Sequence, residues 1–224
     1  MARGRYTPNP VKGGIKRRKQ PQPSLTPMNS DTAVVRYNTV GDNVETNGTY
    51  SAYAGYRMYI PGSISGLPAL APGPRIVANY STAKFLPGTN VRWEPSVSFT
   101  TSGRVYVGFT DNPEIMSDLI ARIATFNSAP TSTAYQSVAA IVKNFGNVVS
   151  FPVWQETTIP VPSRLRRKRF DTNANSTSDP DILDRSAQVG MFMVADGVGS
   201  LNTFLGSFHY HDSVEVEGVT VTTT

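Results

Sequence analysis

Runs of alternating apolar and polar residues fill most of the chain from about residue 31 onward. In the run Arg104–Phe109, Val105, Val107 and Phe109 share one parity. The long C-terminal run repeats the pattern, with Phe208, Tyr210, Val214 and Val216 on one parity and His209, His211, Glu215 and Glu217 on the other. A period of two is typical of a strand that buries one face and exposes the other.

Further segments rich in Val, Ile, Thr and aromatic residues are also predicted as strands. They cover residues 33–40, 49–60, 76–85, 90–93, 148–154, 157–161 and 189–195. The Gly- and Pro-rich stretch 61–74 is predicted as a long turn region, and the polar stretch 171–184 as a loop. The apolar run 190–194 is more continuous than a one-sided strand requires, which indicates that part of it lies in contacts with other chains.

Two short helices are predicted between strands. Asp111 or Asn112 can cap the first, with Pro113 in its first turn and Glu114 near its positive end. Its apolar stripe consists of Ile115, Met116, Leu119, Ile120 and Ile123. The second begins at about Thr133 and ends before Gly146. Its inward residues are Val138, Ile141 and Val142.

About eight strands with two short helices in their connections predict an all-β fold, and the usual eight-stranded form is the jelly-roll β-sandwich. The 224 residues suffice for one such domain but are few for two. We therefore expect residues 31–224 to form one jelly-roll domain. Residues 1–30 contain five prolines and few bulky apolar groups, so we expect a disordered arm there.

Charge is distributed unevenly along the chain. Residues 1–30 hold seven of the 21 basic residues and no acid, and residues 164–169 hold five more. The rest of the chain then has nine basic residues against 16 acidic ones, although the net charge of the whole is +5. Two concentrated basic segments on an acidic body indicate a polyanionic partner that is met at defined places.

Several classes of protein are disfavoured by the composition. The chain has no cysteine, which excludes disulfides, zinc-thiolate sites and thiol nucleophiles. It has no Gly-x-Ser-x-Gly elbow and no phosphate-binding Gly loop, so we expect no enzyme and no small-molecule substrate. The basic N-terminus lacks a secretory apolar segment and no stretch is long enough to span a membrane, so a soluble protein made in a cytosol is expected.

One block of sequence carries a specific resemblance. Trp93-Glu94-Pro95 is followed, after seven residues, by Gly103-Arg104-Val105-Tyr106-Val107-Gly108-Phe109-Thr110-Asp111. This block resembles the shell domain of tombusvirus- and sobemovirus-like coat proteins of small icosahedral plant RNA viruses. Short forms without a projecting domain, such as ourmiavirus-like coat proteins, are similar in size. One residue separates Phe109 from Asp111 here, where the family usually has two.

The resemblance implies a capsid protein that self-assembles into an icosahedral homo-oligomer in the virion, with assembly in the host cytoplasm. Its basic arm would package single-stranded genomic RNA. The alternative is a non-viral nucleic-acid-binding or lectin-like β-sandwich that stays monomeric or forms a small oligomer. Size in solution separates the two.

The candidate RNA-binding residues are the cations of both basic segments. They are Arg3, Arg5, Lys12, Lys16, Arg17, Arg18, Lys19, Arg164, Arg166, Arg167, Lys168 and Arg169. Such side chains neutralise phosphates without reading bases. A solubilising tail or a nuclear-import signal remains open for the first segment. For the second, pairing with an acidic surface of another subunit or proteolytic cleavage on a secretory route remains open.

The resembling shells bind calcium between subunits through aspartates that follow the matched strand. The corresponding acids here are Asp111, Glu114 and Asp118, with Asp171, Asp179, Asp181 and Asp184 as a second set. Calcium requires several oxygen ligands, which two chains together could supply. The alternative is that Asp111 and Glu114 cap a helix, and the spacing favours it. His209 and His211 share an exposed face but lack a third metal ligand.

Overall fold

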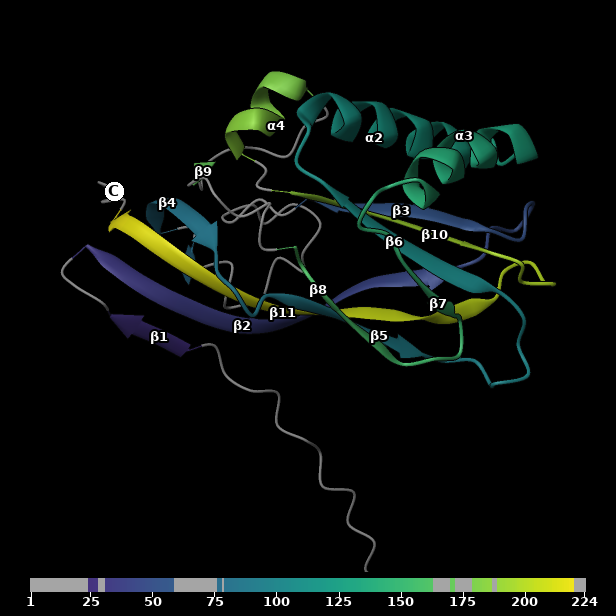
Figure 1. Ribbon diagram of the computed structural model, residues 1–224, viewed down its shortest axis with the longest axis horizontal. Helices are drawn as coiled ribbons and strands as arrows, with labels where there is room; N and C mark the ends of the chain where they lie inside the picture. Colours follow the sequence, from purple (N-terminus) through teal and green to yellow (C-terminus); the bar gives the residue numbers. More distant parts are fainter. Residues whose placement is uncertain are drawn as a thin grey trace, which may run out of the picture.

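Two antiparallel sheets face each other, and helices cover the outer side of one of them (Figure 1). The computed structural model describes residues 24–27, 31–58, 76–77, 79–162, 170–171, 179–186 and 189–219. The expected turn region 61–74 lies outside these ranges. No helix among the described residues is long and apolar enough to cross a membrane.

The larger sheet has seven strand segments in the order β1-β2-β11-β4-β9, with β5 pairing with β11 and β8 pairing with β5. Its strands are β1 (Ser24–Pro27), β2 (Thr32–Glu45), β4 (Tyr80–Phe85), β5 (Asn90–Pro95), β8 (Thr157–Pro160), β9 (Phe170–Asp171) and β11 (Phe204–Val219). Strands β4 and β5 pair with successive halves of β11 and so occupy one position in the sheet. The same holds for β9 and β8, which pair with β4 and β5 respectively.

The smaller sheet has four strands in the order β3-β10-β6-β7. They are β3 (Tyr53–Met58), β6 (Arg104–Thr110), β7 (Val149–Pro152) and β10 (Gly190–Asp196). Apart from the short edge strand β1, the larger sheet thus has four positions, as the smaller sheet does. The chain crosses from one sheet to the other after β2, β3, β5, β7, β9 and β10, as in an eight-stranded jelly roll. The predicted fold class is confirmed.

A core of apolar side chains fills the space between the sheets and is centred on Trp93 of β5. This side chain is fully buried, its Nε1–H donates to the carbonyl of Val153 at 3.0 Å, and its ring lies 4.9 Å from that of Phe208. The predicted inward parity of β11 is confirmed, because Phe208, Tyr210, Val214 and Val216 are all buried. Alternation along the strand therefore determines which residues enter the core.

Two helices lie on the outer face of the four-stranded sheet. Helix α2 (Pro113–Ser128) is capped by Asn112, whose Oδ1 accepts from the N–H groups of Glu114 and Ile115. Helix α3 (Ser132–Lys143) is capped by Thr131. Both predicted helices are confirmed, with Asn112 rather than Asp111 as the cap of the first. The hydroxyl and amide caps satisfy N–H groups that have no partner inside the helix.

The helices form a second apolar layer with the sheet beneath them, and this corrects one expectation about the run 190–194. In β10, Met191 and Met193 face the core between the sheets, whereas Phe192 and Val194 face α2 and α3. The continuous apolar run is thus buried on both sides within a single chain. The expected contacts with other chains are wrong for this segment, because the chain's own helices cover it.

The polar stretch 171–184 is not entirely a loop. It contains a third helix, α4 (Pro180–Ser186), where Asp179 Oδ1 accepts from the Asp181 N–H at 2.9 Å. Leu183 is fully buried on this helix and joins the layer of α2. The expected loop therefore includes a helix, which the sequence pattern did not reveal because seven residues are too few to show a helical period.

The sheet also begins earlier than the predicted boundary at Asp31. Strand β1 lies within residues 1–30 and pairs with β2 from Ser24↔Arg36 to Pro27↔Ala33. Pro27 is tolerated there because β1 is an edge strand with one unpaired side. Residues 1–23, which make up most of the expected arm, lie outside the described residues.

Candidate functional site

All twelve cations expected to contact RNA lie outside the described residues: Arg3, Arg5, Lys12, Lys16, Arg17, Arg18, Lys19, Arg164, Arg166, Arg167, Lys168 and Arg169. The described chain nevertheless shows where the two basic segments attach. The first precedes β1 at one edge of the larger sheet, and the second connects β8 and β9 at the opposite edge. Both segments therefore join the sheet that lies opposite α2 and α3 (Figure 1).

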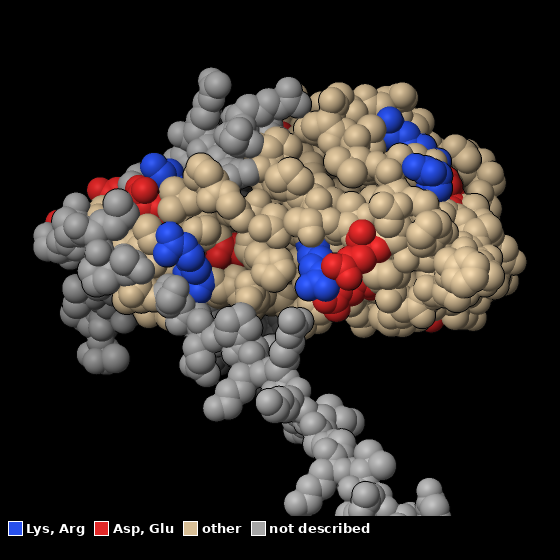
Figure 2. Space-filling model, turned by 60° about the horizontal axis from the view of Figure 1, so that its bottom comes forward, with Lys and Arg blue, Asp and Glu red and all other residues tan. Residues whose placement is uncertain are grey.

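The outer face of this larger sheet is polar and carries mixed charges. Figure 2 shows basic and acidic side chains in small adjoining groups on a mostly uncharged surface. One such group joins β5 to the turn before β8, where Arg92 lies 3.0 Å from Glu156 and 3.4 Å from Glu94. Arg92 is thus already paired with two carboxylates, which leaves it little positive field for an external anion.

The two histidines lie on this same face, as their parity predicted. His209 Nε2 is 3.0 Å from Glu94 Oε2, and His211 Nδ1 is 2.7 Å from Asn38 Oδ1 on β2. Partial burial lowers the pKa of His211 below its ordinary value, and the positive charge of Arg92 acts in the same direction. Its ring hydrogen-bonds with Asn38 and so links β11 to β2.

The acids predicted to hold calcium are spread along the start of α2. Asp111, Glu114 and Asp118 are all exposed, and Asp118 pairs with Arg122 one turn later at 2.8 Å. Within the described parts of the chain, no three His, Asp or Glu side chains are placed to share a metal ion. A site between two chains needs ligands from both, so intersubunit calcium remains a prediction.

The second acidic set is likewise dispersed. Asp171 lies in β9, Asp179 caps α4, and Asp181 and Asp184 lie on that helix. Asp181 and Asp184 are exposed. The capping role of Asp179 accounts for its position without a ligand.

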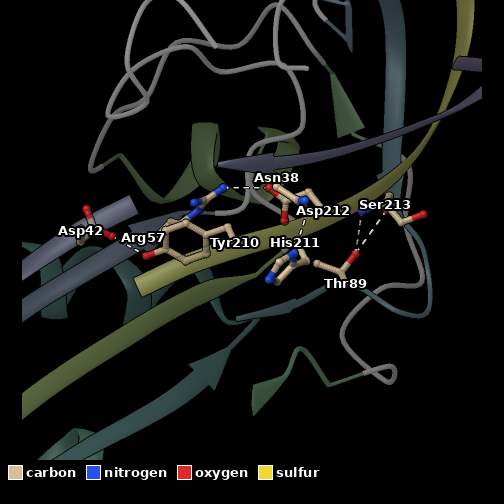
Figure 3. A network of polar contacts seen from close by, with 8 residues as sticks. All are labelled: Asn38, Asp42, Arg57, Thr89, Tyr210, His211, Asp212 and Ser213. Atoms are coloured by element: carbon tan, nitrogen blue, oxygen red, sulfur yellow. Dashed lines mark hydrogen bonds and ion pairs between the residues drawn. The ribbon is translucent and has the colours of Figure 1, made fainter. Parts of the chain in front are cut away.

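A buried polar network inside the sandwich was not predicted. Arg57 of β3 reaches across to β11, where its Nη2 lies 3.0 Å from Asp212 Oδ2 (Figure 3). The Arg57 guanidinium also stacks 3.4 Å above the ring of Tyr210, whose hydroxyl donates to Asp42 on β2. Gly41 makes this arrangement possible, because a Cβ there would lie 1.7 Å from the Tyr210 ring.

Asp212 is desolvated in this network, since its side chain is fully buried. Burial raises the pKa of its carboxyl, while the guanidinium of Arg57 opposes the shift. A signal for this pair was present in the sequence: Asp212 occupies the inward parity of β11 between Tyr210 and Val214. An acid among the inward-facing apolar positions of a strand needs a buried cation as its partner. The alternation of apolar and polar residues does not identify Arg57 as that cation.

Comparison with known proteins places the fold. No family model matches the chain, and no curated protein matches its sequence. Solved structures do match. The chain of tobacco necrosis virus aligns with a TM-score of 0.65 and 12% identity, over 90% of this chain and 89% of that one. The chain therefore shares its fold with this virus chain. The resemblance to tombusvirus-like coat proteins, drawn from the sequence, is confirmed as a likeness of fold.

Two more solved structures differ in the share of their own length that this chain covers. Mud crab tombus-like virus aligns with a TM-score of 0.62 and 12% identity, over 92% of this chain and 94% of that one. Cucumber necrosis virus aligns with a TM-score of 0.62 and 18% identity, over all of this chain but only 63% of that one. The chain therefore corresponds to most of the shorter virus chains and to about two thirds of the longer one.

Proposed function

We propose that this chain is a coat protein whose copies assemble into a closed icosahedral shell around single-stranded RNA. The observation that carries the proposal is the jelly-roll likeness over 90% of the chain to a solved virus structure. The likeness covers nearly the whole chain rather than one motif. At these identities it establishes the fold alone, so assembly must be tested directly.

The distribution of charge supports RNA as the enclosed partner. The two basic segments together hold twelve cations, whereas on the described sheet face between them Lys84 and Arg92 are each paired with acids. Both segments attach to the same sheet, at opposite edges. Cations concentrated on such segments bind phosphates by counterion release and without sequence preference.

The first test combines negative-stain electron microscopy with the ratio of absorbance at 260 and 280 nm on the purified full-length chain. Uniform particles with a nucleic-acid-like ratio are the expected result. A chain that stays monomeric and free of nucleic acid across salt, pH and calcium would refute the coat-protein proposal. It would favour the alternative of a small-oligomer binding module.

The role of the arm has its own test, with a matched control. Removing residues 2–19 takes away all seven arm cations and leaves β1 intact. On single strands each neutralised phosphate contributes about 0.7 to the slope of log affinity against log salt, so this deletion should reduce the slope by up to about 5. Replacing the five cations of 164–169 with glutamine should reduce it by up to about 3.5. An unchanged slope in both variants would exclude RNA binding by these segments.

Calcium belongs to the proposal as a ligand held between subunits by Asp111, Glu114 and Asp118. Their exposure at the start of α2 leaves the carboxylates accessible to a second chain. Shells treated with a chelator should sediment more slowly or dissociate, and calcium should reverse the change. Replacing Asp111 and Glu114 with Asn and Gln should remove the response. A chelator response that persists in this variant would place the ion elsewhere.

A further inference from the structure

Both histidines of the chain lie on the outer face of the larger sheet. The sequence has two, His209 and His211, and both are on β11 at the parity opposite to the buried Phe208 and Tyr210. Histidine is the side chain whose ordinary pKa lies between about pH 5 and 8. Among the side chains, mild acidification therefore adds positive charge mainly to this one face.

A shared carboxylate links His209 to the arginine beside it. Glu94 of β5 has one oxygen, Oε2, 3.0 Å from His209 Nε2, and the other, Oε1, 3.4 Å from Arg92 Nη2. Arg92 also lies 3.0 Å from Glu156, so it faces two carboxylates while His209 is neutral. A protonated His209 competes with Arg92 for Glu94. More of the field of the guanidinium is then available to an external anion.

His211 gains a second hydrogen-bond donor when it is protonated. Its Nδ1 lies 2.7 Å from Asn38 Oδ1 on β2, and this oxygen can only accept, so Nδ1 carries the hydrogen of the neutral ring (Figure 3). The proton that is taken up in acid therefore binds to Nε2. The bond to Asn38 is kept, and a charged N–H group is added that can donate to a phosphate oxygen.

The other acids on the flanking strands already have partners or lie at or near strand ends. They are Asp212 with Arg57, Asp42 with the hydroxyl of Tyr210, Glu215 with Lys84 of β4, and Glu45 and Glu217 toward the ends of β2 and β11. The further cation is Arg36, which is exposed two residues before Asn38 on the same parity of β2. The charge around the histidines is therefore set by Arg92, Glu94 and Glu156.

Protonation reverses the sign of this local charge. With both histidines neutral, Arg92 is one cation against the two acids Glu94 and Glu156. With both histidines protonated, three cations stand against the same two acids. The face thus changes from one that repels a polyanion to one that attracts it.

We propose that this face is a second site for RNA phosphates, which binds when His209 and His211 are protonated. Both basic segments join the same sheet at opposite edges, so RNA held by them is kept close to the face between them. Because phosphates favour the protonated rings, RNA binding and proton uptake strengthen each other. The inference rests on the proposed RNA binding and adds its regulation by pH.

The test measures the affinity of the full-length chain for a single-stranded RNA oligonucleotide by fluorescence anisotropy at pH 7.5 and at pH 5.5. A salt series is recorded at each pH, under conditions where sedimentation shows only monomer, and circular dichroism checks that each variant is folded. The double variant His209→Gln/His211→Gln removes both titrating groups and keeps polar side chains. The matched variant His209→Lys/His211→Lys carries the two charges at both pH values.

On single strands each neutralised phosphate adds about 0.7 to the slope of log affinity against log salt, so two protonated histidines should add up to about 1.4. At about 0.1 M salt the unaltered chain should then bind up to about 25-fold more tightly at pH 5.5 than at pH 7.5. The glutamine variant should bind at both pH values as the unaltered chain does at pH 7.5. The lysine variant should bind at both as the unaltered chain does at pH 5.5.

Two results would overturn the histidine site and leave RNA binding by the basic segments intact. One is an unaltered chain with the same affinity and salt slope at both pH values. The other is a glutamine variant that keeps the full response to pH, or a lysine variant without tighter binding at pH 7.5. A folded, unaltered chain that binds no RNA at either pH would instead overturn the proposed RNA partner.

Discussion

Removing the carboxylate of Asp212 should destabilise the fold far more than removing an exposed acid. The Asp212 side chain is fully buried, and its partner Arg57, 3.0 Å away, is only 11% exposed. Asp212→Ala leaves the guanidinium buried without a counter-charge, and breaking such a pair costs about 3–5 kcal/mol. At about 2–4 °C per kcal/mol for a domain of this size, we expect the melting temperature to fall by roughly 6–20 °C.

The matched control is Asp118→Ala. Asp118 and Arg122 form an ion pair of similar length, 2.8 Å, but their side chains are 48% and 41% exposed. Exposed pairs of this kind on a helix contribute about 0.3–0.5 kcal/mol. The melts should be recorded where sedimentation shows only monomer, because assembly itself raises the apparent stability. Equal shifts in the two variants would refute the argument that burial makes the Arg57–Asp212 pair essential.

A double substitution separates the charge from the space it fills. Replacing Arg57 with Met and Asp212 with Leu removes both charges and keeps most of the volume. Buried ion pairs replaced in this way are often neutral or more stable by about 1–4 kcal/mol. The double variant should therefore melt well above Asp212→Ala. A double variant as unstable as the single one would show that the stacking of Arg57 on Tyr210, rather than the charge, holds the sheets together.

Three further predictions follow from local geometry. Asn112→Ala removes the cap of α2 and should lower the free energy of unfolding, measured in urea, by about 0.5–2 kcal/mol. Asp111→Ala should lower it by less than about 0.5 kcal/mol, and the reverse order would contradict the cap assignment. Gly108→Ala should destabilise by about 1–3 kcal/mol, since its Cβ would lie 2.4 Å from the Phe145 ring, and an unchanged urea midpoint would show that the ring can move. The lowered pKa of His211 means that the unfolded chain binds its proton first, so stability should fall as pH drops below about 6.5. In His211→Gln the melting temperature should depend less on pH between 7.5 and 5, and an unaltered profile would assign that dependence to other groups.

Much of the fold could be predicted from the sequence because its strands are governed by alternation. The strand Arg104–Thr110 shows this: Val105, Val107 and Phe109 face the core between the sheets, as their parity required. The other face was harder to assign. Gly108 is buried against Phe145, because the two helices that follow this strand cover that side of the sheet. Alternation shows that one face of a strand is buried. It does not show whether helices elsewhere in the chain cover the strand's other face.

The candidate site could be predicted only in part. The histidines lie on one face of the larger sheet as parity indicated. Of the acids proposed for calcium, Asp118 lies on α2 and Asp111 precedes its cap, and one chain alone does not bring them together with a third ligand among the described residues. The Arg57–Asp212 pair joins positions 155 residues apart, which no local pattern can reveal. Phe99 is exposed in the connection between β5 and β6, and no motif in the sequence marks it.

The low identity to the matched virus chains follows from what each layer of this fold requires. The two apolar layers need side chains of suitable size on both parities of β10 and one parity of β11, and many sequences satisfy that demand. The exposed connections between the sheets are not constrained by the core in this way, so their residues can differ between chains that share the fold. A jelly roll can therefore be retained at 12% identity.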